Sequence, residues 1–278
     1  STIYDMSFSG TTLYLGGNFT TINGQTRNRA AAYNTTNNTL LNWNPNLDGS
    51  VNWISGDAGS VLVGGDFSNV GTASRKYAAE LNTTTGAATA WNPQLNNSTY
   101  VGLKRGTEIT LGGVFDWSKY ESRSYILAYD ITTRLITSWN PSANSTVNQI
   151  LPYSNGNVIV TGSFTNIGNQ TRNRIAQVTK TNGSATTWNP NVNGQVYALT
   201  ENAGILYIGG SFTSVNNTNR NNVAALNLTD NSPMPWNPDA SNYVNVLLYN
   251  NNKVFAGGAF TTIGGQTRRY FAALDAGS

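Results

Sequence analysis

The sequence predicts an all-β fold, specifically a six-bladed β-propeller, on three observations. Only 10% of the residues are charged, and Asn, Thr, Ser and Gly replace the Lys and Glu that favour helices. Three sequence markers recur in phase, about 48 residues apart. Each repeat contains several short segments typical of strands, and a repeat of about 40 to 50 residues with four strands is typical of one propeller blade. Six such repeats account for the whole chain.

The markers define the repeat boundaries. The first marker is the Phe of a Gly-Gly-x-Phe type of segment: Phe19, Phe67, Phe115, Phe164, Phe212 and Phe260. An Arg lies eight residues after each Phe: Arg27, Arg75, Arg123, Arg172, Arg220 and Arg268. The sequence Trp-Asn-Pro closes five repeats: Trp43, Trp91, Trp139, Trp188 and Trp236. We therefore predict one domain, residues 1–278, with blades at approximately 1–48, 49–96, 97–144, 145–193, 194–241 and 242–278.

Each repeat is expected to contain four strands. The first is an apolar stretch such as 51–54, the second ends in Gly-Gly as in 13–17, and the third follows the Arg as in 29–33. A turn rich in Asn, Thr and Gly, such as 82–86, leads to a fourth strand that ends at the Trp. The second glycine of each pair suits a β-bulge or a close approach of two backbone segments. Because the sixth repeat ends before its turn, the last blade is expected to lack its outer strand and to leave an open edge. Two explanations are open: the natural chain continues or begins earlier, which is the more economical one, or a partner or neighbouring subunit adds the strand.

The composition excludes several kinds of chemistry. The chain contains no Cys and no His, which excludes a thiol nucleophile, a Ser-His-Asp triad and His/Cys metal sites. We expect no cofactor and no metal. The 16 cations and 13 anions form no block of like charge, so nucleic-acid binding is not expected. No apolar stretch approaches the roughly 18 residues of a membrane span.

The recurring Arg has two interpretations. Six cations at one end of a propeller form a potential anion site. No carboxylate recurs in phase with them, however, so a shared role must use backbone carbonyls or aromatic faces. We favour a structural role, in which each guanidinium ties its own loop to the Trp-Asn-Pro connection at the same end of the blade.

The repeat unit resembles a known family. Its pattern GGxFTxIxxxxRxxxAAxN…TxGxxxxWNP, clear in 16–20 with Arg27 and in 43–45, resembles the delta-60 repeats of bacterial surface β-propellers. The resemblance covers the chain from end to end. It implies a propeller on a secreted or surface-attached microbial or viral protein, and it implies no known reaction.

A more distant similarity is to quinoprotein propellers, whose docking motif is similar to Ala79, Asn82, Gly86 and Trp91. The Gly-to-Trp gap is one residue longer here, and there are six repeats where those enzymes usually have eight. Pyrroloquinoline quinone is therefore not expected.

The third repeat departs most from the others, and this is where we place a ligand-binding hypothesis. Its loop carries Trp117, Lys119 and Tyr120, with Trp117 in place of Thr or Asn and Ser118 in place of Ile or Val. Two aromatic rings beside hydrogen-bonding groups can stack on a sugar ring and bind its hydroxyls. The alternative is a tolerated loop variant whose Trp packs locally.

A second pattern lies in the predicted first strands. One position alternates strictly between Tyr and Asn: Tyr4, Asn52, Tyr100, Asn148, Tyr197 and Asn245. First strands line the central channel of a propeller, and alternate residues point inward. We predict that these six residues line the channel. The alternative is that this side of each strand faces a neighbouring sheet.

These observations predict a non-enzymatic extracellular propeller module for adhesion, protein assembly or glycan binding. One alternative is a carbohydrate-active enzyme that uses paired carboxylates, for which Asp5, Asp57, Glu108, Glu201 and Asp239 show no common phase. The other is a structural subunit of a surface layer or filament. The expected partner is a glycan or another surface protein, with no membrane span.

Overall fold

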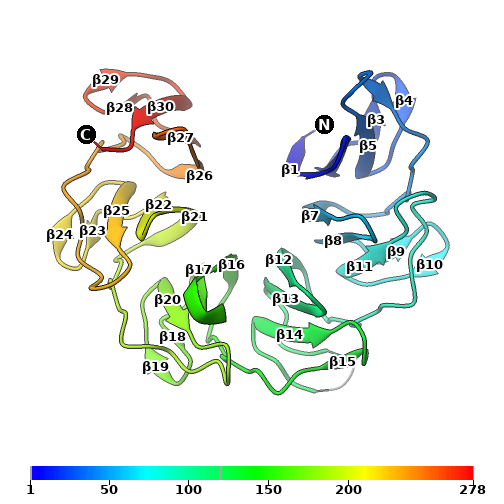
Figure 1. The fold of residues 1–278 in the computed structure, drawn as a ribbon, viewed down its shortest axis with the longest axis horizontal. Helices are drawn as coiled ribbons and strands as arrows, with labels where there is room; N and C mark the ends of the chain where they lie inside the picture. The colour runs from blue at the N-terminus through cyan, green and yellow to red at the C-terminus, as the bar shows by residue number, and fades with distance from the viewer. Residues whose placement is uncertain (1, 119–120, 278) are drawn as a thin grey trace. The chain divides into compact units, whose positions relative to one another are not determined.

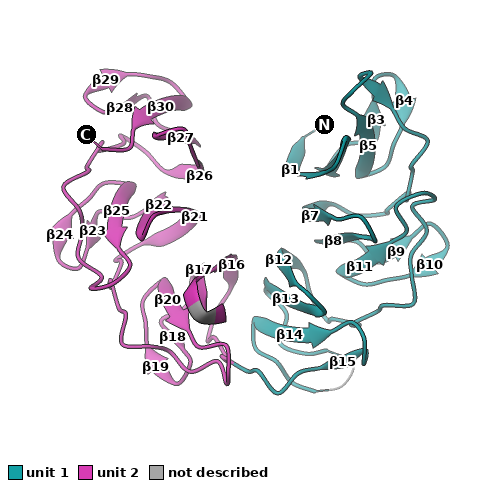
Figure 2. Ribbon diagram, in the orientation of Figure 1, with its two compact units in different colours: residues 1–140 teal, residues 141–278 magenta. Residues whose placement is uncertain are grey.

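The structure, a computed structural model, describes residues 2–118 and 121–277. It confirms the all-β prediction, because strands account for nearly all of the regular structure and the helical content of the described residues is one short 3₁₀ turn, η1 (Ser154–Gly156). The chain divides into two compact units, residues 1–140 and 141–278 (Figure 2). Each unit contains three main sheets built from consecutive stretches of the chain (Figure 1).

The main sheets of the first unit follow one another along the sequence. The first contains β1 (Ile3–Ser9), β2 (Thr12–Gly17), β5 (Ala30–Asn34) and β6 (Thr39–Leu40). The second contains β7 (Val51–Gly56), β8 (Val61–Gly65) and β11 (Ala78–Leu81). The third contains β12 (Thr99–Arg105), β13 (Glu108–Gly113), β14 (Ile126–Asp130) and β15 (Leu135–Ile136). Two small hairpins extend from this unit: β3 (Thr21–Ile22) with β4 (Gln25–Thr26), and β9 (Asn69–Val70) with β10 (Ala73–Ser74).

The second unit repeats this order. Its sheets contain β16 (Val147–Pro152), β17 (Val158–Gly162) and β20 (Ile175–Val178); β21 (Gln195–Asn202), β22 (Ile205–Ser211) and β25 (Val223–Asn227); and β26 (Val244–Asn250), β27 (Lys253–Gly258) and β30 (Phe271–Asp275). Its hairpins are β18 (Asn166–Ile167) with β19 (Gln170–Thr171), β23 (Ser214–Val215) with β24 (Thr218–Asn219), and β28 (Thr262–Ile263) with β29 (Gln266–Thr267).

The predicted fourth strand is much shorter than expected. It is two residues long in the first and third sheets, as β6 and β15. In three other sheets it is a single bridge: Leu81 with Ala88, Val178 with Ala185, and Leu226 with Pro233. The sheet–sheet cores therefore depend on the first three strands.

A β-bulge in the first strand is common to all six sheets. The pairing of each first strand with the second strand skips one residue opposite the Gly-Gly pair or its equivalent. The skipped residues are Tyr4, Asn52, Tyr100, Asn148, Tyr197 and Asn245. A Cβ on the second glycine, as at Gly17 or Gly65, would collide with a backbone carbonyl at the start of the first strand. The bulge and the close backbone approach expected from the glycines thus occur together.

Within each unit, the first strand of a sheet packs on the first two strands of the preceding sheet. We call each such sheet–sheet interface a joint. At the first joint, between the first and second sheets, Val51 and Ile54 of β7 lie over Gly16, where an added Cβ would come within 2.6 Å of the Val51 Cγ1. At the last joint, Val244 and Leu247 of β26 lie over Gly209 in the same way. The hydrophobic cores accordingly lie between sheets, and the marker Phe residues are buried there or beside them.

The recurring Arg residues connect two segments of backbone. Five of them donate from Nη1 to the carbonyl of the preceding residue and from Nη2 to a carbonyl 14 residues later, at 2.5–3.2 Å. The distant acceptors, each two residues before the marker Trp, are Leu41, Thr89, Thr137, Thr186 and Met234. Arg268 is exposed and donates instead to Ala273 O at 2.8 Å.

Three of the Trp residues connect successive sheets. Their Nε1 groups donate to a carbonyl at or just beyond the end of the third strand of the next sheet, at 2.7–3.4 Å. The pairs are Trp43 with Asn82, Trp188 with Asn227, and Trp236 with Asp275. Each indole thus satisfies its N–H while it buries a large apolar surface.

We predict that Arg220→Lys lowers the free energy of unfolding by about 1–2 kcal/mol, because one ammonium group cannot reproduce the fork that bonds two separate carbonyls. Arg268→Lys is the matched control, and its cost is expected to stay below about 0.5 kcal/mol at this exposed site. Urea unfolding of both variants measures the difference. Equal losses for the two variants would contradict the role of the double contact.

Candidate functional site

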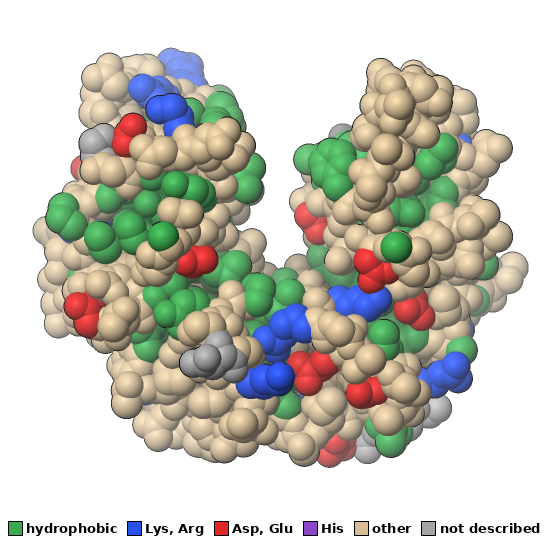
Figure 3. All heavy atoms as spheres, viewed as in Figure 1, with side chains coloured by type: hydrophobic (Ala, Val, Ile, Leu, Met, Phe, Trp, Pro, Cys, Tyr) green, Lys and Arg blue, Asp and Glu red, His purple; other side chains and the backbone are tan. Residues whose placement is uncertain are grey.

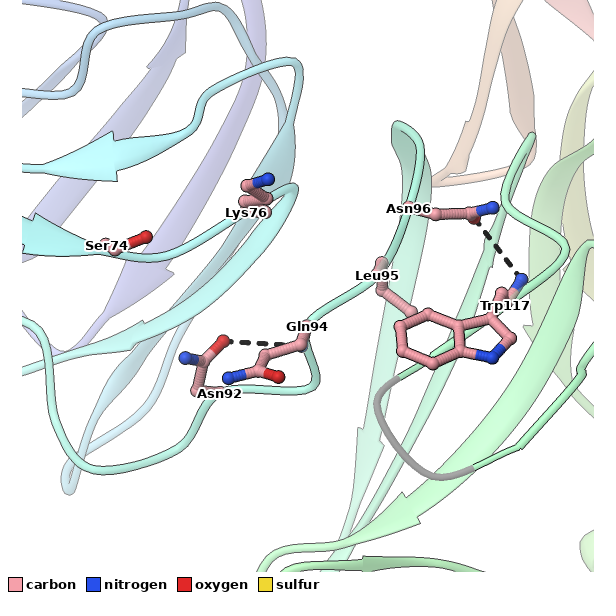
Figure 4. A pocket seen from close by; sticks show the side chains of 7 residues that line it. All are labelled: Ser74, Lys76, Asn92, Gln94, Leu95, Asn96 and Trp117. Carbon is pink, nitrogen blue, oxygen red and sulfur yellow. Dashed lines mark hydrogen bonds between the residues drawn. The ribbon is translucent and has the colours of Figure 1, made fainter.

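One hollow of the first unit lies beside Trp117. It has a volume of about 420 Å³ and is lined by Ser74, Lys76, Asn92, Gln94, Leu95, Asn96 and Trp117. We call it the Trp117 pocket. Figure 4 shows its residues arriving from the segment around β10, from the Trp-Asn-Pro connection and from the loop after β13. The pocket therefore combines one indole with three side-chain amides, one hydroxyl and one ammonium group.

Trp117 is held by its backbone while its side chain stays available. Its N–H donates to Asn96 Oδ1 at 3.3 Å, and its carbonyl accepts from the Asn96 N–H at 3.3 Å. A bridge to Ser122 closes the loop around it. The side chain nevertheless remains 46% exposed, next to the buried Leu95. An indole that is fixed at one end and open to solvent on the other is suited to stacking on a ligand.

Asn96 has a supporting role that the sequence interpretation missed. The equivalent side chain in four other repeats also accepts from two successive N–H groups of the loop after the second strand. The equivalents are Asp48, Asn144, Asn193 and Ser241. All five lie five residues after the marker Trp. This regular spacing was the available signal, and the change among Asp, Asn and Ser concealed it.

Ser118, in the same loop, is buried, and its hydroxyl has no hydrogen-bond partner among the described residues. The equivalent positions carry apolar residues such as Val70 and Val215, which are buried in the core. An unpaired buried hydroxyl opposes folding. The third repeat therefore tolerates a local loss of stability next to Trp117.

We predict that Ser118→Val raises the free energy of unfolding by about 1 kcal/mol, because Val removes the unpaired hydroxyl and restores the apolar contact of the other repeats. Thermal and urea unfolding measure this change. The control is Ser122→Val, since the Ser122 hydroxyl donates to Asp116 O at 3.2 Å and its loss should not be stabilising. A Ser118→Val variant that is less stable than the wild type would contradict the prediction.

The other predicted ligand residues have separate outcomes. Lys119 and Tyr120 lie outside the described residues. The six Tyr and Asn residues of the first strands are the bulge residues of their sheets, and none of them is buried. The Trp117 pocket contains none of them.

Each of the five carboxylates considered as catalytic candidates accepts a hydrogen bond from the chain itself. Asp57 pairs with Lys104 at 2.5 Å, and Glu108 with Arg105 at 3.5 Å. Glu201 accepts from the Gly204 N–H and Asp239 from the Asn221 side chain. Asp5 accepts from the Ile54 N–H of the next sheet at 2.8 Å. None of the five lines the Trp117 pocket, and the described residues hold no cluster of three or more metal-ligating acids.

Asp5 and Asp48 have pKa values shifted in opposite directions. Burial raises the pKa of Asp5, although the N–H groups of Ile54 and Met6 partly oppose this. At Asp48, partial burial also raises the pKa. The backbone N–H groups of Asn69 and Ser68 and the Asn69 side-chain amide together lower it by more, so the net pKa lies below its ordinary value. Asp48 therefore stabilises the fold when ionised.

We predict that Asp48→Asn leaves stability nearly unchanged at pH 7 and makes the protein less sensitive to acid. The wild-type contribution is present above the unfolded pKa of 3.8 and is lost as the pH falls through the lower folded pKa. Asn, which already serves at position 96, accepts the two backbone N–H bonds without titrating. Urea unfolding between pH 7 and pH 2.5 measures both curves. Parallel curves for the two proteins would contradict this role of the carboxylate.

Comparisons with known proteins support a β-propeller. The family model described as "Domain of unknown function (DUF5122) beta-propeller" matches residues 59–87, 154–185 and 204–230, which lie in the second, fourth and fifth repeats. The chain carries β-propeller repeats. A search of curated proteins found no match to the chain. The described residues contain no helix that is both long and apolar enough to cross a membrane.

Two solved structures illustrate the similarity of fold. The crystal structure of the computationally designed Ika8 protein is 14% identical, with a TM-score of 0.61 over 96% of this chain and 73% of that chain. A chain in the crystal structure of the Mitotic Checkpoint Complex is 12% identical, with a TM-score of 0.65 over 93% of this chain and 70% of that chain. At such low identity these similarities concern the fold alone.

Proposed function

We propose that the chain is a six-bladed, delta-60-type propeller that works outside the cell as a non-enzymatic module and binds glycans at the Trp117 pocket. Six successive sheets, each with a bulged first strand, support the blade number. The repeated Gly-Gly, Arg and Trp-Asn-Pro markers support the repeat type, and the surface location follows from that resemblance alone. Adhesion or protein assembly is the expected consequence of glycan binding.

The half-exposed indole of Trp117 is the observation that carries the glycan proposal. The equivalent positions hold Thr21, Asn69, Asn166, Ser214 and Thr262, so an aromatic ring appears in this loop in the third repeat alone. Sugars present an apolar face of C–H groups, which stacks on an indole, and a rim of hydroxyls, which bond to amides.

The polar residues of the Trp117 pocket match such a ligand. Asn92, Gln94 and Asn96 provide amide donors and acceptors, and the exposed Lys76 adds one positive charge. No carboxylate lines the pocket. Neutral sugars or sugars with an acidic group therefore fit this pocket better than basic ligands do.

We also propose that the six bulge residues line the central channel. Support comes from their common place in the first strands and from the partial or full exposure of all six. Two of them lie next to other polar groups: Asn52 donates to Thr99 O at 3.2 Å, and Tyr197 donates to Gln195 Oε1 at 2.6 Å.

A glycan array followed by titration calorimetry tests the glycan proposal. For a glycan bound by the wild type, Trp117→Thr should weaken binding by about 10-fold or more, because stacking is lost. Thr is native at two equivalent positions, so this variant should fold normally.

Tyr4→Thr is the control, since it removes an aromatic side chain of similar exposure, 50%, from the same unit. It should leave binding unchanged. The absence of any bound glycan, or a loss of binding in Tyr4→Thr but not in Trp117→Thr, would contradict the proposal.

A further inference from the structure

A recurring side-chain bridge connects the residue after the marker Arg to the Trp-Asn-Pro connection. Its two residues lie 18 positions apart in the sequence, and the second lies three residues after the marker Trp. In three repeats an Asn amide donates to the side-chain oxygen of an Asn or Asp at 2.7 Å. The pairs are Asn28 with Asn46, Asn173 with Asn191, and Asn221 with Asp239. The bridge therefore holds two loop segments of one repeat together.

The second repeat replaces both residues of the bridge. Its equivalent positions hold Lys76 and Gln94, which are exposed and whose side chains share no hydrogen bond. The Lys76 ammonium forms no ion pair with any residue that the structure describes. Among the five repeats that contain both positions, the second alone has a charged residue at the first position. The charge of Lys76 is therefore a feature of this repeat and not of the shared scaffold.

The backbone at Gln94 has the same conformation as in the bridged repeats. The φ of Gln94 is 48°, and the bridged residues have similar values: 55° at Asn46, 46° at Asn191 and 51° at Asp239. Asn and Asp adopt this left-handed conformation more readily than Gln does, because their short side chains hydrogen-bond to the local backbone. Gln94 therefore lacks both a favourable backbone preference and the bridge. Only the side chains differ, so the change concerns what the two positions contact.

The two unbridged side chains line the Trp117 pocket together with the exposed indole. In the view of Figure 4, Lys76 and Trp117 lie on opposite sides of the connection that carries Gln94. The ammonium group can only donate hydrogen bonds, whereas the Gln94 amide can donate and accept them. The carboxylate of Asp116, next to Trp117 in the sequence, accepts from the Asn96 amide and does not line the pocket. The pocket thus combines a stacking surface with one positive charge that no lining carboxylate neutralises.

Charge is sparse elsewhere on the protein. The chain has 16 cations and 13 anions among its 278 residues. On the face drawn in Figure 3, charged side chains are few and of mixed sign, and most of the surface is uncharged. A surface of this kind has no broad field that attracts anions. The choice of a charged ligand therefore depends on individual groups within a site.

We propose that the Trp117 pocket selects glycans that carry a carboxylate, and that Lys76 is the specificity-determining residue. The Lys76 ammonium donates to the carboxylate, the Gln94 amide bonds to a neighbouring oxygen of the sugar, and an apolar sugar face stacks on Trp117. The two positions that form a bridge in other repeats here bind the ligand instead. This specificity rests on the glycan binding proposed above, since Lys76 selects among ligands that Trp117 holds.

Matched acidic and neutral glycans test the proposal. The array carries oligogalacturonates, hyaluronan fragments and sialylated oligosaccharides, each beside its carboxyl-reduced counterpart. The wild type should bind an acidic form at least about 5-fold more tightly than its reduced counterpart, because a charge-assisted bond is lost on reduction. This advantage should shrink between about 50 and about 300 mM salt, since screening weakens exposed charge pairs. Equal binding of the two forms, or binding of reduced forms alone, would overturn the proposal.

Variants of Lys76 assign the selectivity to that residue. Lys76→Gln should lose the advantage of the acidic form and leave binding of the reduced form unchanged, whereas Lys76→Arg should keep the advantage. Arg269→Gln is the matched control, because it removes the same charge from an exposed residue at the equivalent position of the sixth repeat. It should leave both affinities unchanged. Equal effects of Lys76→Gln and Arg269→Gln would show a general attraction between charges and would overturn the role of Lys76.

Trp117→Thr separates a failure of this selectivity from a failure of glycan binding itself. If acidic and reduced forms bind equally and both are lost in Trp117→Thr, the pocket binds glycans but Lys76 does not select them. If the wild type binds no glycan on the array, both proposals are wrong. If Trp117→Thr weakens both forms by the same factor while Lys76→Gln weakens the acidic form alone, both proposals are supported.

Discussion

The close backbone approach at the second glycine of each pair is the constraint on which the sheets depend. A side chain there would collide with the carbonyl at the start of the first strand, as at Gly17 and Gly258. The same approach coincides with the one-residue bulge opposite the glycines. The bulge shifts the following residues so that the first and fourth positions of the strand, such as Val51 and Ile54, both face the preceding sheet. One backbone feature thereby determines which side chains build the core between sheets.

The joints preserve this geometry while their chemistry varies. At the first joint, the Asp5 carboxylate accepts an N–H from β7, and at another the Gln149 amide accepts an N–H from β21. At the second joint, Trp53 occupies the position of Asp5 and donates to Thr99 Oγ1 at 3.0 Å. Gly102 makes room for that indole, since a Cβ there would overlap its ring. A large residue on one strand is thus balanced by the loss of a side chain on the next, as dense packing requires.

The sequence was sufficient to predict the strands whose residues are constrained by backbone geometry. The Gly-Gly pairs and the Arg spacing predicted the first three strands and their order. The fourth strand was overestimated, because its carbonyl has another use: Thr89 donates its N–H to Glu80 O but gives its own carbonyl to Arg75. The Thr89 carbonyl thus bonds to the Arg75 guanidinium instead of to a neighbouring strand. Of the Trp117 pocket, the sequence predicted Trp117, because this residue departs visibly from the repeat. It did not predict Asn92 and Gln94, because they lie in the Trp-Asn-Pro connection and reach the pocket only once the chain is folded.

The loop of Trp117 keeps the contacts of the repeated scaffold while its side chains differ from those of the other repeats. The loop is held at two places. The Asn96 side chain accepts the Asp116 and Trp117 N–H groups, and Arg123 donates to Thr137 O at 3.2 Å. The Asn96 contact uses the backbone N–H groups of Asp116 and Trp117, so the side chain of Trp117 is free to differ from those at the equivalent positions. Ser118 shows that the change has a cost, since its hydroxyl is buried without a partner among the described residues. The third repeat differs from the other repeats in this loop and loses local stability there. Such a site is where selection for binding is expected to act.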